Sequence, residues 1–573
     1  MPTEAKILIS EGMKLFLDKY RGPVENALRK LDKENFVSRL WSKDASLWKK
    51  EPEHQKIINN SLGWLTVADF LSGKLDDIAS LAEEIKNEGF TDAVLLGMGG
   101  SSLAAEVMRL SLPALKGYPK LHVLDSTDPG WVESIERSVN MNKTVFIVSS
   151  KSGTTIEPHC FYSYFFDRAK QNGKQFIAIT DPGSRLESIA KEKKFRKIFI
   201  NPSDIGGRFS ALSFFGLVPA GIAGMDIKAL VLKATAMMRS CGSDVPAPVN
   251  PGVVLGGVLG ELARHGRDKV TVFLPEGLES FGLWIEQLVA ESSGKEGKGI
   301  VPIAGESAGD VSSYGADRLF ITVNFAGKKN TKTEKLMDAL KNAHPVVEIE
   351  IKEPSDLGGE FLRWEIATAA ACSILGIDAF DQPNVQEAKD LAKALLKELS
   401  EKGSLPGIKY DVSGKKLKAG FSSASKGLDL GSPEKALSGF LKSIKPGEYI
   451  GLLAYFPFKP DVDKKLECLR TMLRDKIRSS TLFGYGPRYL HSTGQLHKGG
   501  ANNGVFIILA AGAETDLIVP GQNYTFGQLE SAQVLGDFQA LDSRGRRAVY
   551  IKLETPLIDS MDEVYRMFEN VLK

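Results

Sequence analysis

The stretch AVLLGMGGSS, from Ala93 to Ser102, decides the fold. Its four leading apolar residues are typical of a strand buried on both faces, and the segment LAAEVMRL that follows has helical spacing. A glycine-rich turn between a strand and a helix presents backbone N–H groups at the positive end of the helix, which suits an anion. The sequence therefore predicts a parallel α/β sheet with an anion site at the end of its first strand.

Taken alone, this turn admits three interpretations. It can be a tight structural turn, or it can hold a phosphate. It can also bind a dinucleotide, because the pattern GxGxxG is incomplete only at Ser102, and Asp125 at the end of the next predicted strand could accept the ribose hydroxyl. A nicotinamide-dependent dehydrogenase is therefore one alternative function.

Short apolar runs separated by helix-length segments continue along the chain. This alternation is typical of βαβ units, which build parallel sheets. The predicted strands fall into three sets: 93–96, 121–124, 145–148, 176–179 and 197–200; then 270–274, 299–303, 319–323 and 346–351; then 449–456, 505–510 and 548–553.

We predict an α/β fold with two tandem doubly wound parallel-sheet domains and an additional C-terminal α/β segment. The helical spacing before residue 75 is interpreted as a packing extension without chemistry. The expected boundaries are 1–75 for this helical extension, 76–240 and 241–403 for the two sheet domains, 404–435 for a linker with room for one hairpin, and 436–573 for the C-terminal segment.

The composition excludes several classes of protein. Hydrophobic residues are 43% and charged residues 25% of the chain, which excludes a disordered or fibrous protein. The 73 basic and 71 acidic residues give a net charge of +2, so nothing calls for nucleic acid or an anionic membrane as partner. Glycine is in excess, with 56 of 573 residues, which hints at turns held open for a ligand.

The cysteines and the N-terminus indicate the compartment. Cys160, Cys241, Cys372 and Cys468 lie far apart without a CxxC pair, which favours reduced thiols over a disulfide framework or a zinc site. The N-terminus lacks the apolar core of a signal peptide, and no apolar run reaches the ~18 residues of a membrane span. We expect a cytoplasmic protein.

A second anion cradle is predicted at the end of the third strand. The run TVFIVSS leads into Ser150-Lys151-Ser152-Gly153-Thr154-Thr155 and then a helix. Hydroxyls and amides at the carboxyl end of a parallel strand can bind a phosphate monoester without a fixed cation, with Lys151 free to point to solvent.

GMGGSS followed by SKSGTT resembles the sugar-isomerase (SIS) domain, a phosphosugar-binding module. Three longer motifs resemble those of the glucose-6-phosphate isomerase family: SDIGGRFSALS at 203–213, QLVAESSGK at 287–295 and AFDQPNVQEAK at 379–389. The chain as a whole is most similar to the isomerase half of bacterial transaldolase–glucose-6-phosphate isomerase fusions. We expect no transaldolase barrel in this sequence, because only about 75 residues precede the isomerase part.

The resemblance implies two SIS-type domains and a cofactor-free, metal-free aldose–ketose isomerase acting on glucose 6-phosphate and fructose 6-phosphate through a cis-enediol. It also implies a homodimer with sites near the subunit interface. Glu291 would move the proton between the carbons, and Gln287, one helical turn earlier, would share its face. Arg208 would stabilise the enediolate, and Lys389 would assist ring opening.

The remaining roles concern the phosphate, which anchors the substrate away from the reacting carbons. The residues expected to hold it are Gly100, Ser101, Ser150, Ser152, Thr155 and Gln382. Glu157, two residues past Thr155, is expected to order water or the phosphate loop.

The histidines depart from the family pattern. The segment GESAGDVSSYGADRLFITV, where the family has its ring-opening histidine, contains none, and His344 looks structural. Further along, LHSTGQLH at 490–497 resembles the LHSxGQ element that carries this histidine in many bacterial members. We therefore expect His491, with His497 as the fallback, to come from the C-terminal segment, within the chain or across a dimer. The other histidines have no metal-ligand spacing.

Besides the dehydrogenase, one more alternative stays open. SIS domains also occur in regulators, so the chain could be a phosphosugar sensor without catalysis. Such a sensor would have no use for Glu291, Arg208 and Lys389 together, and no DNA-binding module is visible.

Overall fold

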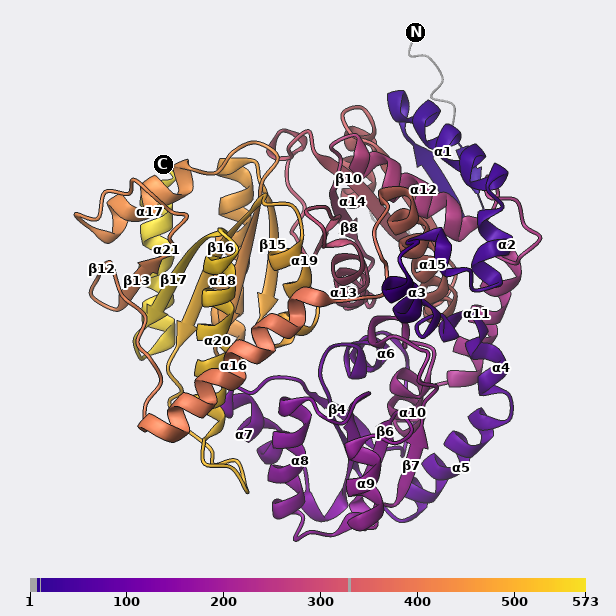
Figure 1. Cartoon of the computed structure of the whole chain (residues 1–573), viewed down its shortest axis with the longest axis horizontal. Coiled ribbons are helices and arrows are strands. Elements are labelled where there is room, and N and C mark those ends of the chain that lie inside the picture. The colour runs from indigo at the N-terminus through magenta and orange to yellow at the C-terminus, as the bar shows by residue number, and fades with distance from the viewer. Residues whose placement is uncertain (1–7, 11, 328–330) are drawn as a thin grey trace.

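The computed structural model describes residues 8–10, 12–327 and 331–573. They form three sheets with helices on both faces (Figure 1). The first sheet is wholly parallel, in the order β4-β3-β5-β6-β7. Its strands are β3 (Asp92–Leu96), β4 (Lys120–Leu124), β5 (Thr144–Ser149), β6 (Phe176–Thr180) and β7 (Lys197–Ile200). The strand order reverses between β3 and β5, and ligands bind at the carboxyl end of such a switch point.

The second and third sheets share one topology. Each has four parallel strands, β9-β8-β10-β11 and β15-β14-β16-β17, and a hairpin that pairs antiparallel with the last strand. The second sheet contains β1 (Leu8–Ser10), β2 (Met13–Phe16), β8 (Lys269–Phe273), β9 (Val301–Ala304), β10 (Arg318–Phe325) and β11 (Val346–Ile351). The third contains β12 (Val412–Ser413), β13 (Leu417–Phe421), β14 (Tyr449–Tyr455), β15 (Ser480–Tyr485), β16 (Gly504–Ala511) and β17 (Arg547–Leu553).

Helices connect the strands and cover the sheets. The first part of the chain has α1 (Arg21–Lys33), α2 (Phe36–Trp41), α3 (Pro52–Asn59), α4 (Val67–Leu71), α5 (Lys74–Asn87), α6 (Leu103–Ser111), α7 (Pro129–Ser138), α8 (Ile156–Arg168), α9 (Arg185–Glu192), α10 (Phe214–Ile222) and α11 (Ile227–Ser240). The rest has α12 (Pro251–Arg264), α13 (Phe281–Ser293), α14 (Thr331–Lys341), α15 (Leu357–Leu375), α16 (Pro383–Lys402), α17 (Pro433–Lys442), α18 (Pro460–Ile477), α19 (Gly494–Gly499), α20 (Phe526–Ser543) and α21 (Leu557–Val571). Among the described residues, no helix is long and apolar enough to cross a membrane.

The predicted α/β class with parallel sheets is confirmed, and the boundaries of the second and third sheets differ from the prediction. The N-terminal extension is not purely helical, because β1 and β2 form a hairpin on β11 with Met13 and Leu15 buried. The third sheet starts before residue 436, since β13 from the expected linker pairs with β17. Strand β15 was not predicted at all. This strand has six residues and begins with the polar pair Ser480 and Thr481. Its sequence therefore shows little of the apolar pattern by which a strand is predicted.

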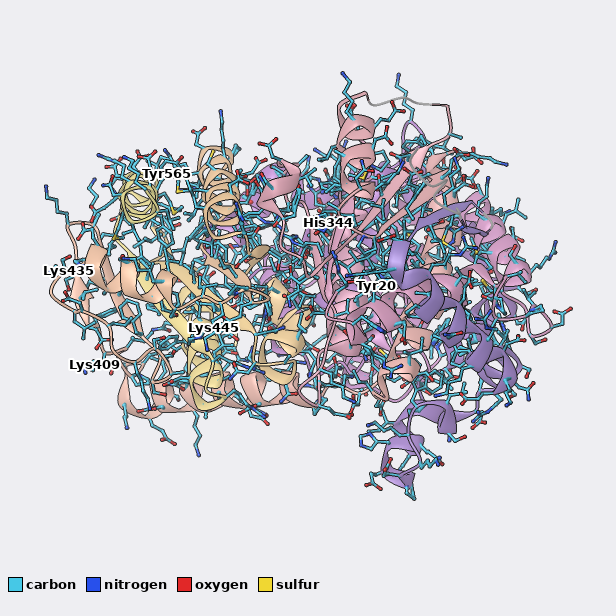
Figure 2. The ribbon with its side chains drawn as sticks, turned by 90° about the horizontal axis from the view of Figure 1, so that it is seen from above. Tyr20, His344, Lys409, Lys435, Lys445 and Tyr565 are labelled. Atoms are coloured by element: carbon cyan, nitrogen blue, oxygen red, sulfur yellow. The ribbon has the colours of Figure 1, made fainter. Side chains whose placement is uncertain are left out.

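The three parts of the chain lie side by side (Figure 1). Figure 2 shows this from above, with Lys435 and Tyr565 on the side of the C-terminal segment and Tyr20 and His344 on the other. Of the N-terminal helices, α1, α2, α4 and α5 run along the outside of the first two sheet domains, whereas α3 lies near the middle of the view (Figure 1). They are tied down by buried contacts, such as the Trp48 indole N–H that donates to Ala369 O at 2.8 Å.

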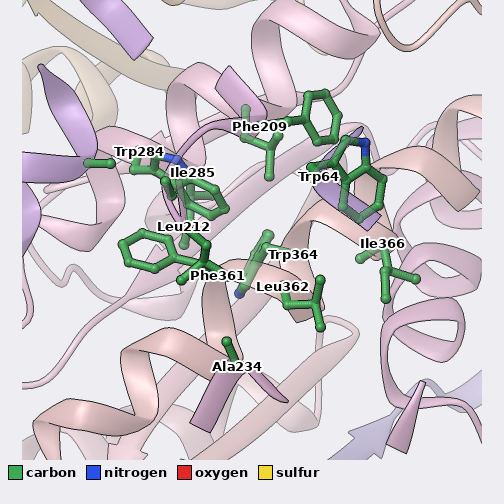
Figure 3. Close-up of a cluster of buried hydrophobic side chains, with 14 of the residues drawn as sticks. Trp64, Phe209, Leu212, Ala234, Trp284, Ile285, Phe361, Leu362, Trp364 and Ile366 are labelled. Carbon is green, nitrogen blue, oxygen red and sulfur yellow. The ribbon is translucent and has the colours of Figure 1, made fainter. Parts of the chain in front are cut away.

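An aromatic core holds the elements that carry the functional side chains (Figure 3). Trp284 on α13 meets Phe361 on α15 edge to face, with ring centroids 4.7 Å apart. Phe209 stacks on Trp64 at 5.2 Å. Because interiors are packed as densely as crystals, these rings hold α13 against α15 and the turn at Gly207–Phe209 against Trp64. The core thereby places Glu291 and Arg208.

Candidate active site

A cavity of about 470 Å³ lies at the carboxyl ends of β3, β5 and β6. Most residues predicted for catalysis or substrate binding line it: Gly100, Ser101, Ser152, Thr155, Arg208, Gln287, Glu291, Gln382, Lys389 and His491. All three parts of the chain therefore contribute to one pocket. A wider cavity of about 1210 Å³ adjoins it through Lys151, Gly207, Arg208 and Gln382 and is walled on its far side by α3. This geometry makes the wider cavity the entrance.

Two glycine turns meet at the floor of the pocket. The turn after β3 lies so close to the turn at 206–208 that a Cβ on Gly100 would sit 2.1 Å from Gly207 O. Gly99 has a φ of +53°, and a Cβ there would sit 2.7 Å from His491 O. Only glycine allows these close approaches, which leave the backbone N–H groups of the first turn beside the pocket.

Glu291 and Arg208 form a buried pair. Arg208 Nη1 lies 3.2 Å from Glu291 Oε1, and the two residues are 4% and 5% exposed. Three further bonds hold the guanidinium, since Nε donates to Ser292 Oγ at 2.7 Å and Nη2 donates to Ala379 O at 2.6 Å and to Asp381 O at 3.1 Å. The cation is thus fixed in direction, as electrostatic stabilisation of a developing charge requires.

Gln287 joins this pair to His491. Its amide Nε2 donates to His491 O at 2.8 Å and to Glu291 Oε2 at 3.3 Å. Its Oε1 is buried and has no hydrogen-bond partner among the described residues. An acceptor left open in a pocket wall is suited to a substrate hydroxyl.

His491 faces Glu157. The distance from His491 Nε2 to Glu157 Oε1 is 2.9 Å, and Glu157 is 3% exposed. Burial by itself would raise the pKa of Glu157, but the charge and hydrogen bond of His491 outweigh it and lower that pKa. Glu157 therefore lies behind the histidine and outside the pocket wall, and its expected role in ordering water or the phosphate loop stays a prediction.

His497 occupies a different environment. Its Nδ1 lies 3.1 Å from the Tyr449 hydroxyl and its Nε2 lies 2.9 Å from Thr493 Oγ1, and the ring is buried. Burial holds its pKa well below the ordinary value. The structure brings His491, and not His497, into the pocket.

Only part of the second predicted anion site, the loop at 150–155, faces the pocket. Ser150 is buried, and its Oγ accepts the N–H of Gly153 at 3.1 Å, so it shapes the loop and does not line the pocket. Ser152 and Thr155 line the pocket. Lys151 does not point to solvent, because its ammonium group pairs with Asp181 and donates to Ser203 O at 2.7 Å.

Sequence reasoning missed two groups of residues near the site. The loop from Asp181 to Ser184 lines the pocket after β6, and the same strand-end rule that selected Ser152 could have found it. Gln533 on α20 hydrogen-bonds to Glu157, and no local pattern marks it.

Two further expectations can be compared with the geometry. Asp125 is fully buried, is paired with Arg488 at 2.7 Å and does not line the pocket, which speaks against its use as a ribose acceptor. His54 does have acidic neighbours, contrary to what spacing suggested. Its Nδ1 lies 3.0 Å from Asp378 Oδ2 and 3.8 Å from Asp381 Oδ2, a group that could hold a metal ion. Asp381 is already paired with Lys295 at 2.6 Å.

Comparison with known proteins agrees with this geometry. A model of the phosphoglucose isomerase family matches residues 78–311. A probable glucose-6-phosphate isomerase of Methanococcus maripaludis is 30% identical over 387 residues, which are 60% of this chain and 86% of the relative. The chain belongs to the glucose-6-phosphate isomerase family. Another member, from Parabacteroides distasonis, is 28% identical, with 59% of this chain and 87% of that one covered.

Solved structures show the same fold. A glucose-6-phosphate isomerase from Chlamydia trachomatis superposes with a TM-score of 0.53 at 20% identity, covering 69% of this chain and 90% of that one. A hypothetical protein from Thermus thermophilus gives a TM-score of 0.57 at 23% identity, covering 67% and 99%. The resemblance read from the motifs is therefore confirmed at the level of family and fold.

Proposed function

We propose that this member of the family interconverts glucose 6-phosphate and fructose 6-phosphate through a cis-enediol. The observation that carries the proposal is a single pocket that combines the buried Glu291–Arg208 pair, His491 and Lys389 with hydroxyl and glycine turns at a sheet switch point. A sensor would need the turns alone. The buried acid–base groups fit an enzyme.

The phosphate binds at the turns. Ser101, Ser152 and Thr155 donate hydroxyl hydrogen bonds, the Gly100 turn donates backbone N–H groups, and Gln382 closes the pocket wall. The phosphate does not react, so its binding energy is available to orient carbons 1 and 2 over the acid–base groups.

Ring opening uses His491 and Lys389. Because His491 Nε2 faces Glu157, its Nδ1 is the nitrogen that serves the sugar. One group takes the proton from the anomeric hydroxyl while the other gives a proton to the ring oxygen, and the carbon–oxygen bond between them breaks to give the open-chain aldose or ketose.

Glu291 then moves the proton between the carbons. In the direction from glucose to fructose it takes the proton from carbon 2, which leaves an enediolate with its negative charge on oxygen 1. The hydroxyl proton passes from oxygen 2 to oxygen 1, and Glu291 returns its proton to carbon 1 as the carbonyl forms at carbon 2. Arg208, held 3.2 Å from the same carboxylate, faces the negative oxygen that develops. Gln287 holds the Glu291 carboxylate in position by donating a hydrogen bond to its Oε2.

The variant Glu291→Gln tests this proposal. It keeps the shape of the side chain and removes the base, so kcat should fall by about a thousandfold, while the Kd for 6-phosphogluconate changes less than about threefold. Glu296→Gln, at an exposed position five residues later that pairs with Lys49, is the matched control and should keep wild-type kcat. Near-wild-type turnover by Glu291→Gln would overturn the mechanism.

We further propose that the protein works in the cytoplasm as a homodimer. None of the four cysteines, all of which lie among the described residues, forms a disulfide bond, and three of them are buried, which suits a reducing compartment. The family resemblance supports the dimer. Light scattering on the purified protein should give twice the mass of one chain, and a monomeric mass would reject this part of the proposal.

A further inference from the structure

Behind the pocket, Gln533 of α20 touches the carboxylate that holds His491. Its Nε2 donates to Glu157 Oε1 at 2.7 Å, which is the same oxygen that faces His491 Nε2 at 2.9 Å. Gln533 is 3% exposed and lies outside the pocket wall. Any effect of Gln533 on the sugar is therefore transmitted through Glu157.

A third residue, Thr127, satisfies the other end of this amide. The Thr127 hydroxyl, at the end of β4, donates to Gln533 Oε1 at 2.6 Å, and Thr127 is fully buried. If the amide were flipped, its oxygen would face an ionised carboxylate, and two acceptors would meet without a proton. The Glu157 carboxylate thus fixes the NH₂ group of Gln533 towards itself, and the Thr127 hydroxyl, which can donate or accept, donates to the amide oxygen that this orientation leaves on the other side.

We propose that Gln533 is a positioning residue for ring opening, through the relay Thr127–Gln533–Glu157–His491. By donating to Glu157, Gln533 holds that carboxylate in place, so that His491 keeps Nε2 on Glu157 and offers Nδ1 to the sugar. The C-terminal segment supplies both His491 and Gln533, which contact Glu157 of the first sheet domain from two elements. This inference rests on the proposed ring-opening role of His491.

The relay has a signature in the pH profile. A donor to Glu157 stabilises the more negative state of the Glu157–His491 pair, so its loss raises the apparent pKa of the pair, whichever residue takes the proton. The other titratable groups facing Glu157 are Lys389 on α16, Cys160 on α8 and Tyr524 before α20. Burial raises the pKa of Cys160 to about 12 and raises that of Tyr524 further, so both stay neutral across the useful range.

The variant Gln533→Leu tests the proposal because it keeps most of the volume and removes the donor. We expect kcat with cyclic fructose 6-phosphate to fall by about ten- to a hundredfold, as for loss of a hydrogen bond to a charged group. The limb of the pH profile that belongs to the pair should move to higher pH. Turnover of 5-deoxyfructose 6-phosphate, which has no oxygen at carbon 5 with which to close a ring, should change much less.

Two further variants keep the test decisive. Gln175→Leu removes another buried glutamine, which donates to Met141 O and Thr144 O far from the pocket, and should lower stability without moving the pH limb. Thr127→Val removes the donor to the Gln533 amide oxygen and should move the limb in the same direction, less far. Thr127→Val takes the place of Gln533→Leu as the test if Gln533→Leu does not fold.

The outcomes separate the two proposals. If the wild-type protein has no isomerase activity, the proposed function fails. If the wild type is active and Gln533→Leu matches Gln175→Leu in pH profile and in the ratio of cyclic to open-chain turnover, Gln533 is structural and the inference is wrong.

Discussion

At the scale of single residues, His491 and His497 show how environment assigns a role. Both belong to the segment LHSTGQLH. His491 borders the cavity and faces a carboxylate, whereas His497 is enclosed by Tyr449, Phe506 and Thr493. A histidine whose neutral form is enforced by burial packs like an aromatic ring, while one beside a carboxylate can take and give protons.

We expect His491→Ala and His497→Ala to fail in different ways. His491→Ala should lower kcat for cyclic fructose 6-phosphate by about a hundredfold or more and spare the open-chain analogue. His497→Ala should cost about 2–4 kcal/mol of unfolding free energy, because it leaves a cavity and two unpaired hydroxyls. Steady-state kinetics and urea unfolding measure the two effects. Equal losses on the cyclic and open-chain substrates would contradict the role of His491.

Motif resemblance could predict the residues that touch the pocket, because their types and order stand in the sequence. It could not predict the inward turn of Ser150, the pairing of Lys151 with Asp181, or the position of Glu157 behind His491. These three placements depend on which face of each loop packs against residues that are distant in the sequence. Gln533 shows the limit, since its partner lies 376 residues away.

At the scale of elements, the pocket depends on the contact between two glycine turns. The first follows β3 and the second contains Arg208. The Ser210 hydroxyl donates to Gly100 O at 3.2 Å and ties them together. A displacement of either turn would move the phosphate site relative to the enediolate site.

Gly100→Ala and Gly206→Ala form a matched pair for this contact. The added Cβ would lie 2.1 Å from Gly207 O in the first variant, and its closest neighbour in the second would be Phe209 Cδ2 at 3.8 Å. We expect Gly100→Ala to lose about 1–3 kcal/mol of stability through overpacking and to weaken 6-phosphogluconate binding at least about tenfold. Gly206→Ala should stay close to wild type. Calorimetric titration would measure the affinity of both variants for 6-phosphogluconate. Equal affinities would mean that the two turns can move apart without weakening the phosphate site.

Element prediction succeeded where strands are buried on both faces and failed where they are short or paired at an edge. The run of 144–149 is fully buried and apolar enough to be read directly. The hairpin of β1 and β2 was not predicted, whereas the hairpin of β12 and β13 falls in the linker where one was expected; both complete their sheets by pairing with the edges of β11 and β17. Such pairing partners lie too far along the chain to appear in a local pattern.

At the scale of the whole molecule, a buried ion cluster joins the second and third sheets between β9 and β15. Glu306 Oε1 accepts from Arg318 Nη2 at 3.2 Å and from Thr481 N at 3.0 Å. Arg470 Nη2 donates to Ala304 O at 2.8 Å, across the same junction. Although burial opposes it, the charges of Arg318 and Arg470 lower the pKa of Glu306.

Glu306→Gln should loosen this junction. It leaves buried guanidinium groups without a carboxylate, so we expect a loss of about 3 kcal/mol and reduced activity, because η10 (Arg488–His491) follows directly after β15. The stabilisation by ionised Glu306 is present at neutral pH and is lost as the pH falls below 4.5, so the difference from wild type should shrink in acid. Glu467→Gln, an exposed partner of Ser307 at the same junction, is the control. A wild-type unfolding midpoint for Glu306→Gln at pH 7 would reject this role.

The contact between Glu157 and His491 spans 334 residues. At ribosomal speeds of about 5–20 residues per second, the phosphate turns are synthesised roughly 20 to 60 s before His491 emerges. A nascent chain that has folded its first sheet would already display those turns but would have no group to open the sugar ring. On the proposed assignment, ring opening therefore begins only after the last third of the protein has been made and His491 has docked against Glu157.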